Sequence, residues 1–71
     1  MRILIVDDSA FARERIARLV AAAGLEALQA ANGREALRLV AETRPDAVTV
    51  DLLMPTMDGI QLIERLHAAH P

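Results

Sequence analysis

The 71-residue chain contains no cysteine, tryptophan or tyrosine, and Phe11 is its one aromatic residue. The absence of cysteine excludes disulfide bridges and thiolate metal sites. The near absence of aromatic rings excludes the stacking platforms that bind single-stranded nucleic acid. All eight basic residues are arginines, and a formal net charge of −2 argues against nucleic acid or an anionic membrane surface as a partner.

Long apolar runs are also missing, although 54% of the residues are hydrophobic. No run approaches the ~20 residues that a membrane-spanning helix needs. The apolar run near the N-terminus, residues 3–6, is too short for the core of a signal peptide. We therefore expect a cytoplasmic protein without a membrane segment, and the length allows at most one small domain.

Three short apolar runs alternate with three segments of helical periodicity. The runs Ile3–Val6, Leu25–Ala30 and Ala47–Val50 predict strands. The middle run is interrupted by polar residues, which is typical of an edge strand. Helical segments follow each run, so the order β-α-β-α-β-α predicts an α/β fold with parallel strands.

The first helical segment has recognisable ends. Ser9 is a suitable N-cap, and Gly24 stands where a left-handed residue would end the helix. The spacing predicts that Ile16 and Leu19 face inward, with Arg13 on the opposite side.

The second and third helical segments are bounded less clearly. The Asn32-Gly33 turn precedes the second, and Pro45 is expected to end it by restricting Arg44. The third is expected to begin near Asp58-Gly59 and to carry Ile63 inward.

Aspartates follow two of the predicted strands. Asp7 and Asp8 come after the first strand, and Asp51 comes after the third. Ligands bind at the carboxyl edge of open parallel sheets, so these side chains are expected to converge there if the two strands are neighbours. Close carboxylates repel one another, and a hard cation such as Mg²⁺ would offset that repulsion. The competing interpretation is that each aspartate only caps a helix or forms a turn.

Several segments together resemble one protein family. Ile3–Ser9 is similar to the first strand and acidic pair of bacterial response-regulator receiver domains, and Val48–Gly59 is similar to their phosphoacceptor segment. Asn32–Leu37 fits the start of their second helix. Asp7–Phe11 is most similar to chemotaxis-type receivers.

The resemblance implies a flavodoxin-like receiver fold with sheet order 2-1-3 and a role in two-component signalling. Asp51 matches the residue that accepts a phosphoryl group from a sensor histidine kinase or phosphotransfer protein. Asp8 matches a direct Mg²⁺ ligand, Asp7 a ligand acting through water, and Leu53 the residue whose carbonyl binds the metal. The implied protein is a phosphoacceptor and not an enzyme.

The match stops short of a whole receiver, which has five strands and five helices. We expect residues 1–71 to form a partial receiver domain that lacks the last two strands and helices. The family's Ser/Thr after the fourth strand and lysine after the fifth then have no counterpart, which predicts impaired switching. The exposed edge of the third strand predicts a homo-oligomer.

Other interpretations remain open. A partial domain of this kind could be an oligomerising structural or interaction module without phosphotransfer. Metal-dependent phosphohydrolases of other α/β families also place an aspartate after the first strand, but they need further acid, base or cationic groups. His67 and His70 could form a metal pair on one helix face, although a solvated helix end is the simpler interpretation.

Overall fold

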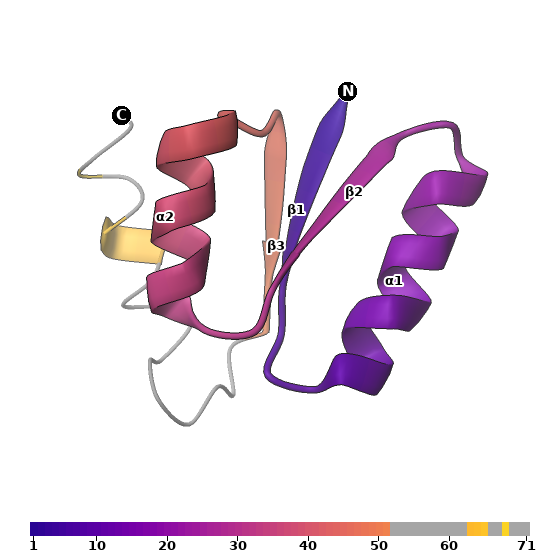
Figure 1. Cartoon of the computed structure of the whole chain (residues 1–71), viewed down its shortest axis with the longest axis horizontal. Helices are drawn as coiled ribbons and strands as arrows, with labels where there is room; N and C mark the ends of the chain where they lie inside the picture. The colour runs from indigo at the N-terminus through magenta and orange to yellow at the C-terminus, as the bar shows by residue number, and fades with distance from the viewer. Residues whose placement is uncertain (52–62, 66–67, 69–71) are drawn as a thin grey trace.

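The structure, a computed structural model, describes residues 1–51, 63–65 and 68. The elements follow in the order β1 (Arg2–Val6), α1 (Ala10–Ala22), β2 (Glu26–Ala30), α2 (Gly33–Thr43) and β3 (Ala47–Val50). Residues 63–65 are helical as well. The two longer helices lie on opposite faces of the sheet (Figure 1). No helix in the described part of the chain is long and apolar enough to cross a membrane.

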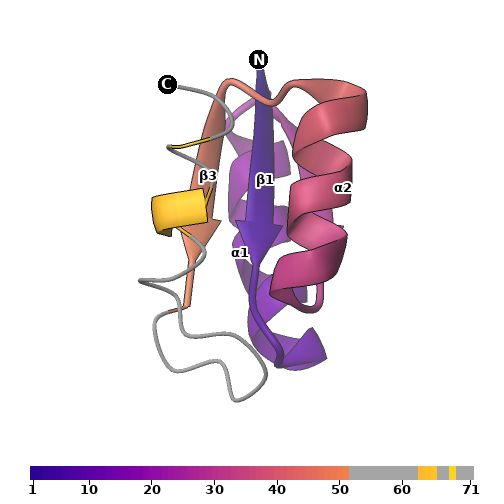
Figure 2. The same ribbon diagram turned by 90° about the vertical axis from the view of Figure 1, so that its left-hand side faces the viewer.

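The sheet has the predicted order β2-β1-β3 and is entirely parallel. Leu4 of the central strand is paired with Leu28 of β2 and Val48 of β3. The central position explains the continuous apolar run of β1, because a strand covered on both faces has no solvent side. Within the described residues β3 pairs only with β1, so it forms one edge of the sheet (Figure 2).

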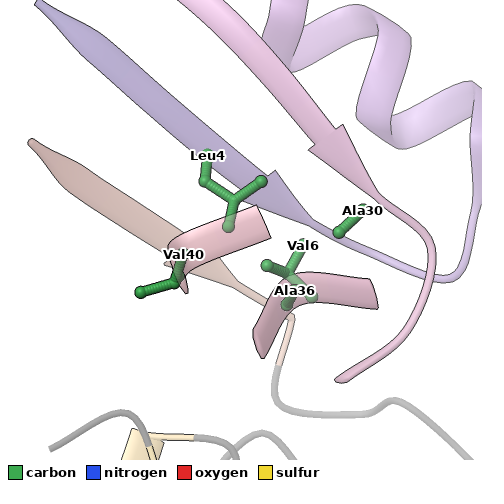
Figure 3. Close-up of a cluster of buried hydrophobic side chains, with 5 residues drawn as sticks. All are labelled: Leu4, Val6, Ala30, Ala36 and Val40. Atoms are coloured by element: carbon green, nitrogen blue, oxygen red, sulfur yellow. The ribbon is translucent and has the colours of Figure 1, made fainter. Parts of the chain in front are cut away.

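The main core lies between the sheet and α2. Leu4, Val6 and Ala30 contribute from the strands, and Ala36 and Val40 contribute from α2 (Figure 3). Leu4 and Val6 are almost completely buried. Because successive strand residues point to opposite faces, Ile3 and Ile5 of β1 point toward the α1 side.

The first helix packs less completely. Its ends are as predicted, since the Ser9 hydroxyl accepts a hydrogen bond from the N–H of Ala12 at 3.2 Å and Gly24 has φ +83°. However, no residue of α1 is fully buried, and Leu19 is 71% exposed. The expectation that Leu19 faces inward is therefore wrong. The helix packs on β2 and β1, and Leu19 lies outside that packed face.

The second helix begins and ends at side-chain and backbone caps. The Asn32 side chain accepts a hydrogen bond from the N–H of Glu35 at 2.9 Å. At the other end, Arg44 adopts φ 48° and ψ 64°, and its N–H still bonds the Val40 carbonyl at 3.0 Å. The helix thus stops before Pro45 as expected. Arg44 leaves the α region for the left-handed region instead of the extended one that proline usually imposes on the residue before it.

The predicted third helix is described only in part. Ile63 was expected to face inward, but it is 47% exposed, so that expectation is wrong in this structure. The predicted loop after Asp51 and the start of this helix lie outside the described residues, as do His67 and His70.

Candidate metal-binding site

The structure brings the three predicted aspartates together. Carboxylate oxygens of Asp7, Asp8 and Asp51 all lie within 4.8 Å of one another. They meet because β1 and β3 are adjacent parallel strands that end at the same level, with Val6 paired to Val50. Leu53, the fourth residue expected at this site, lies outside the described residues.

Backbone hydrogen bonds extend the sheet to two of these aspartates. The N–H of Asp7 bonds the Ala30 carbonyl at 3.1 Å, which continues the pairing of β1 with β2. The N–H of Asp51 bonds the Val6 carbonyl at 3.0 Å, which continues the pairing of β3 with β1. Both residues are therefore held by the sheet itself, and not by a loose connecting loop.

Asp7 and Asp8 have different environments. Asp7 is 9% exposed, and one of its carboxylate oxygens accepts a hydrogen bond from the N–H of Ser9 at 2.9 Å. This bond turns the chain from β1 toward α1, so the turn-forming interpretation holds for Asp7. Asp8 is exposed, and no residue in the described part of the chain bonds its carboxylate. The helix cap is Ser9, so capping does not account for Asp8.

Arg13 also reaches this end of the sheet, which the sequence analysis missed. Its Nη1 donates to the Asp7 carbonyl oxygen at 2.8 Å, and its Nε donates to Oε1 of Gln29 at 3.3 Å. Arg13 is therefore half-buried against the strand ends instead of facing away from them. The one available signal was its place in the first turn after the Ser9 cap, from which a long side chain can return to the preceding strand.

The donor set suits a small hard cation. All three side chains offer carboxylate oxygens, which Mg²⁺ prefers over nitrogen or sulfur. Two oxygens bound to one Mg²⁺ lie at most about 4.2 Å apart, given its short bond lengths. Oxygens that all lie within 4.8 Å of one another are close enough to share one such ion, directly or through water.

Comparisons with known proteins point to a single family. Residues 3–71 match the model of the response regulator receiver domain. The chain is 45% identical over 71 residues to the chemotaxis protein CheY of Thermotoga maritima, covering 99% of this chain and 59% of that protein. It therefore spans about three fifths of that relative's length.

Solved structures agree with the sequence comparisons. Chemotaxis protein CheY4 of Vibrio cholerae superposes with a TM-score of 0.93 at 34% identity, covering 96% of this chain and 57% of that one. The response regulator TrrA of Thermotoga maritima, solved in complex with Mg²⁺-BeF, superposes with a TM-score of 0.92 at 32% identity. That match covers 97% of this chain and 60% of the other.

Proposed function

The chain belongs to the response-regulator receiver family, and we propose that Asp51 accepts a phosphoryl group from a histidine kinase or phosphotransfer protein. The observation that carries the proposal is the meeting of Asp51 with Asp7 and Asp8 at the carboxyl edge of the sheet. Ligands of open parallel sheets bind at this edge. The similarity to chemotaxis proteins supports a role in two-component signalling.

Asp51 acts as the nucleophile in this proposal. One of its carboxylate oxygens forms a bond to phosphorus, while the bond from phosphorus to the donor's histidine nitrogen breaks. The electron pair of the broken bond stays on that nitrogen. The bond from the Asp51 N–H to Val6 holds the nucleophile at the end of β3 during the exchange.

Mg²⁺ is the cofactor of the proposal: Asp8, Asp51 and the Leu53 carbonyl would hold it directly, and Asp7 would hold it through water. When bound, the ion neutralises charge that develops on the transferring oxygens. The Ser9 N–H already occupies one oxygen of Asp7, which leaves the other oxygen for a water molecule. The Mg²⁺-BeF complex of the similar protein TrrA supports the choice of metal.

We expect the 71-residue chain on its own to be a slow phosphoacceptor with impaired switching. Its sequence contains no lysine, so the cationic group that the family supplies after its fifth strand is not available from this chain. Loss of one positioned electrostatic group commonly costs ~10²–10³-fold in rate. In this proposal residues 1–71 act as a partial receiver domain.

Acetyl phosphate tests the proposal without a kinase. In the presence of Mg²⁺, intact-mass spectrometry should show one added phosphoryl group on the wild-type chain and none on Asp51→Asn. Asp46→Asn is the matched control, since Asp46 lies at the opposite end of the sheet, where it accepts a hydrogen bond from the Arg2 N–H. A phosphorylated Asp51→Asn variant, or a folded wild-type chain that never gains the group, would contradict the proposal.

Homodimerisation through β3 is the second proposal, and it is compatible with a structural role that does not involve phosphotransfer. In the described part of the chain β3 pairs on one side only, and Ala47 and Thr49 on it are exposed. Such an edge can pair with another chain. A two-fold axis would join two copies with their β3 strands antiparallel, giving a six-stranded sheet of order 2-1-3-3′-1′-2′.

Two proline substitutions test the strand-paired dimer. The Asp51 N–H points toward β1, and backbone direction alternates along a strand, so Thr49 also faces β1 while Val48 faces the open edge. Val48→Pro should therefore leave the fold intact by circular dichroism and give a monomer by light scattering. Thr49→Pro should instead disrupt the pairing with β1 and lower the stability of the fold. A folded Val48→Pro variant that stays dimeric, or a monomeric wild type, would contradict this dimer.

A further inference from the structure

Arg13 joins the first helix to the ends of two strands. Arg13 lies in the first turn of α1. Its guanidinium donates to the carbonyl of Asp7, directly after β1, at 2.8 Å, and to the side chain of Gln29 in β2 at 3.3 Å. The bond to Asp7 is partly buried, so it competes less with water than an exposed bond does. Both acceptors are neutral groups, so the contact fixes geometry and is not an ion pair.

The bond from Arg13 completes a three-point hold on Asp7. The Asp7 N–H is bound to Ala30, its carboxylate to the Ser9 N–H, and its carbonyl to Arg13. That carbonyl belongs to the peptide unit that leads into Asp8. Peptide units are planar, so fixing the carbonyl oxygen also fixes the direction in which the backbone enters Asp8.

Asp8 depends on this backbone for its direction. Its side chain is exposed, and no described residue bonds its carboxylate. Its oxygen nevertheless lies within 4.8 Å of oxygens of Asp7 and Asp51. The groups that hold the peptide before it therefore set the backbone direction from which the Asp8 side chain reaches the other two carboxylates.

We propose that Arg13 is a positioning residue for the cation site: it holds the Asp7 carbonyl and thereby aims the Asp8 carboxylate. This inference rests on the proposed Mg²⁺ site. It also makes a prediction whose sign differs from that of simple electrostatics. A guanidinium near the site repels a cation, so a purely electrostatic role means that removal of Arg13 tightens Mg²⁺ binding. A positioning role means that removal weakens it.

Calorimetric titration with Mg²⁺ alone separates these roles. Arg13→Ala should weaken Mg²⁺ binding about tenfold, in the range seen when residues that orient metal ligands are removed. Arg13→Lys keeps the charge and one donor, so it should recover part of the affinity. Gln29→Ala removes the second anchor of the guanidinium and should weaken binding less, with little further effect when combined with Arg13→Ala. Arg18→Ala is the matched control, because Arg18 is an exposed arginine of the same helix, and its removal should leave affinity unchanged.

Hydrogen exchange in EDTA tests the positioning directly, without any metal. The Ser9 N–H donates to Asp7, so a loosened turn should expose it. Arg13→Ala should speed its exchange about fivefold, the factor for a net hydrogen-bond contribution of typical size. The Ile5 amide in the central strand reports global opening, and it should exchange much more slowly than Ser9 in both proteins, which shows that Ser9 exchanges by local opening. If Arg13→Ala does not fold, Gln29→Ala serves for both measurements.

The outcomes distinguish this inference from the proposed function. Unchanged Ser9 exchange, or Mg²⁺ affinity that is unchanged or tighter in Arg13→Ala, would overturn the positioning role. A wild-type chain that binds no Mg²⁺ would overturn the metal site. Faster Ser9 exchange in Arg13→Ala than in the wild type would then still show that Arg13 holds the turn.

Discussion

Replacing Asp8 by asparagine should stabilise the metal-free protein and remove its response to Mg²⁺. The carboxylate oxygens of Asp7, Asp8 and Asp51 lie within 4.8 Å of one another. Two unit charges at such a spacing repel by about 1 kcal/mol in a water-like dielectric. Asp8 faces two such partners, but it is exposed, so we discount the sum for solvent screening to about 1 kcal/mol. For a domain of this size that corresponds to a rise in Tm of about 4–8 °C.

Thermal melts in EDTA and in millimolar MgCl₂ measure both effects. The wild type should gain stability from Mg²⁺, because the ion binds only the folded state. Asp8→Asn lacks a ligand and should gain little. The variant should therefore melt above the wild type in EDTA, and the difference should shrink or reverse with Mg²⁺. Adding KCl to the EDTA sample should reduce the gap, because salt screens the repulsion.

Glu42→Gln is the control for this experiment. It removes one exposed negative charge from α2, away from the carboxyl ends of the strands where the three aspartates lie. Its melts should follow the wild type under both conditions. The reasoning fails if Asp8→Asn is no more stable than the wild type in EDTA and responds to Mg²⁺ equally well. That result would mean that the three carboxylates neither repel one another nor share an ion.

Three substitutions test the fold by urea unfolding. Asn32→Ala removes the cap of α2 and should lower the free energy of unfolding by about 1 kcal/mol, whereas Asn32→Ser should lower it little. Equal losses for the two variants would argue against capping. Gly24→Ala should lower the free energy of unfolding by about 1–2 kcal/mol because φ is +83°, although an added Cβ meets nothing within 4 Å. An unchanged urea midpoint would show that this backbone conformation costs alanine nothing. Leu4→Ala should cost about 2–5 kcal/mol because Leu4 is fully buried, whereas Leu19→Ala should change stability by less than about 0.5 kcal/mol; similar losses for both would contradict the assignment of the core.

The sheet was predictable because hydrophobic pattern and chain order restrict it strongly. A run with no polar residue, such as Ile3–Val6, has few places other than the middle of a parallel sheet. The helix ends followed from single residues with specific conformational properties, as Ser9 and Gly24 show.

The burial of individual helix residues was harder to predict. Periodicity identifies one face of a helix, but it does not say how much of that face a neighbour covers. Leu19 has the right spacing for the core of α1 and is nevertheless largely exposed. The prediction for Arg13 was wrong in the opposite sense. Arg13 was expected to face away from the sheet, but its long side chain reaches back to the strand ends from the polar side of α1.

The site was predictable in position and less so in detail. The rule that parallel strands end at one edge was enough to bring Asp51 to Asp7 and Asp8. It did not show that Asp7 is engaged with the Ser9 N–H while Asp8 is exposed. That difference arises from the turn between β1 and α1, whose hydrogen bonds depend on local backbone geometry and not on residue spacing.

The central position of β1 also affects how the chain folds during synthesis. Among the three described strands β1 is synthesised first, yet Ile3 cannot pair with its partner Ala47 until nearly all of the described sheet has been made. Until then an apolar, β-prone segment has no native neighbour on that side and is open to wrong pairing. Charged residues flank it, with Arg2 before it and Asp7 and Asp8 after it. The acidic pair at the proposed metal site thus also stands where charged residues oppose the aggregation of an apolar strand.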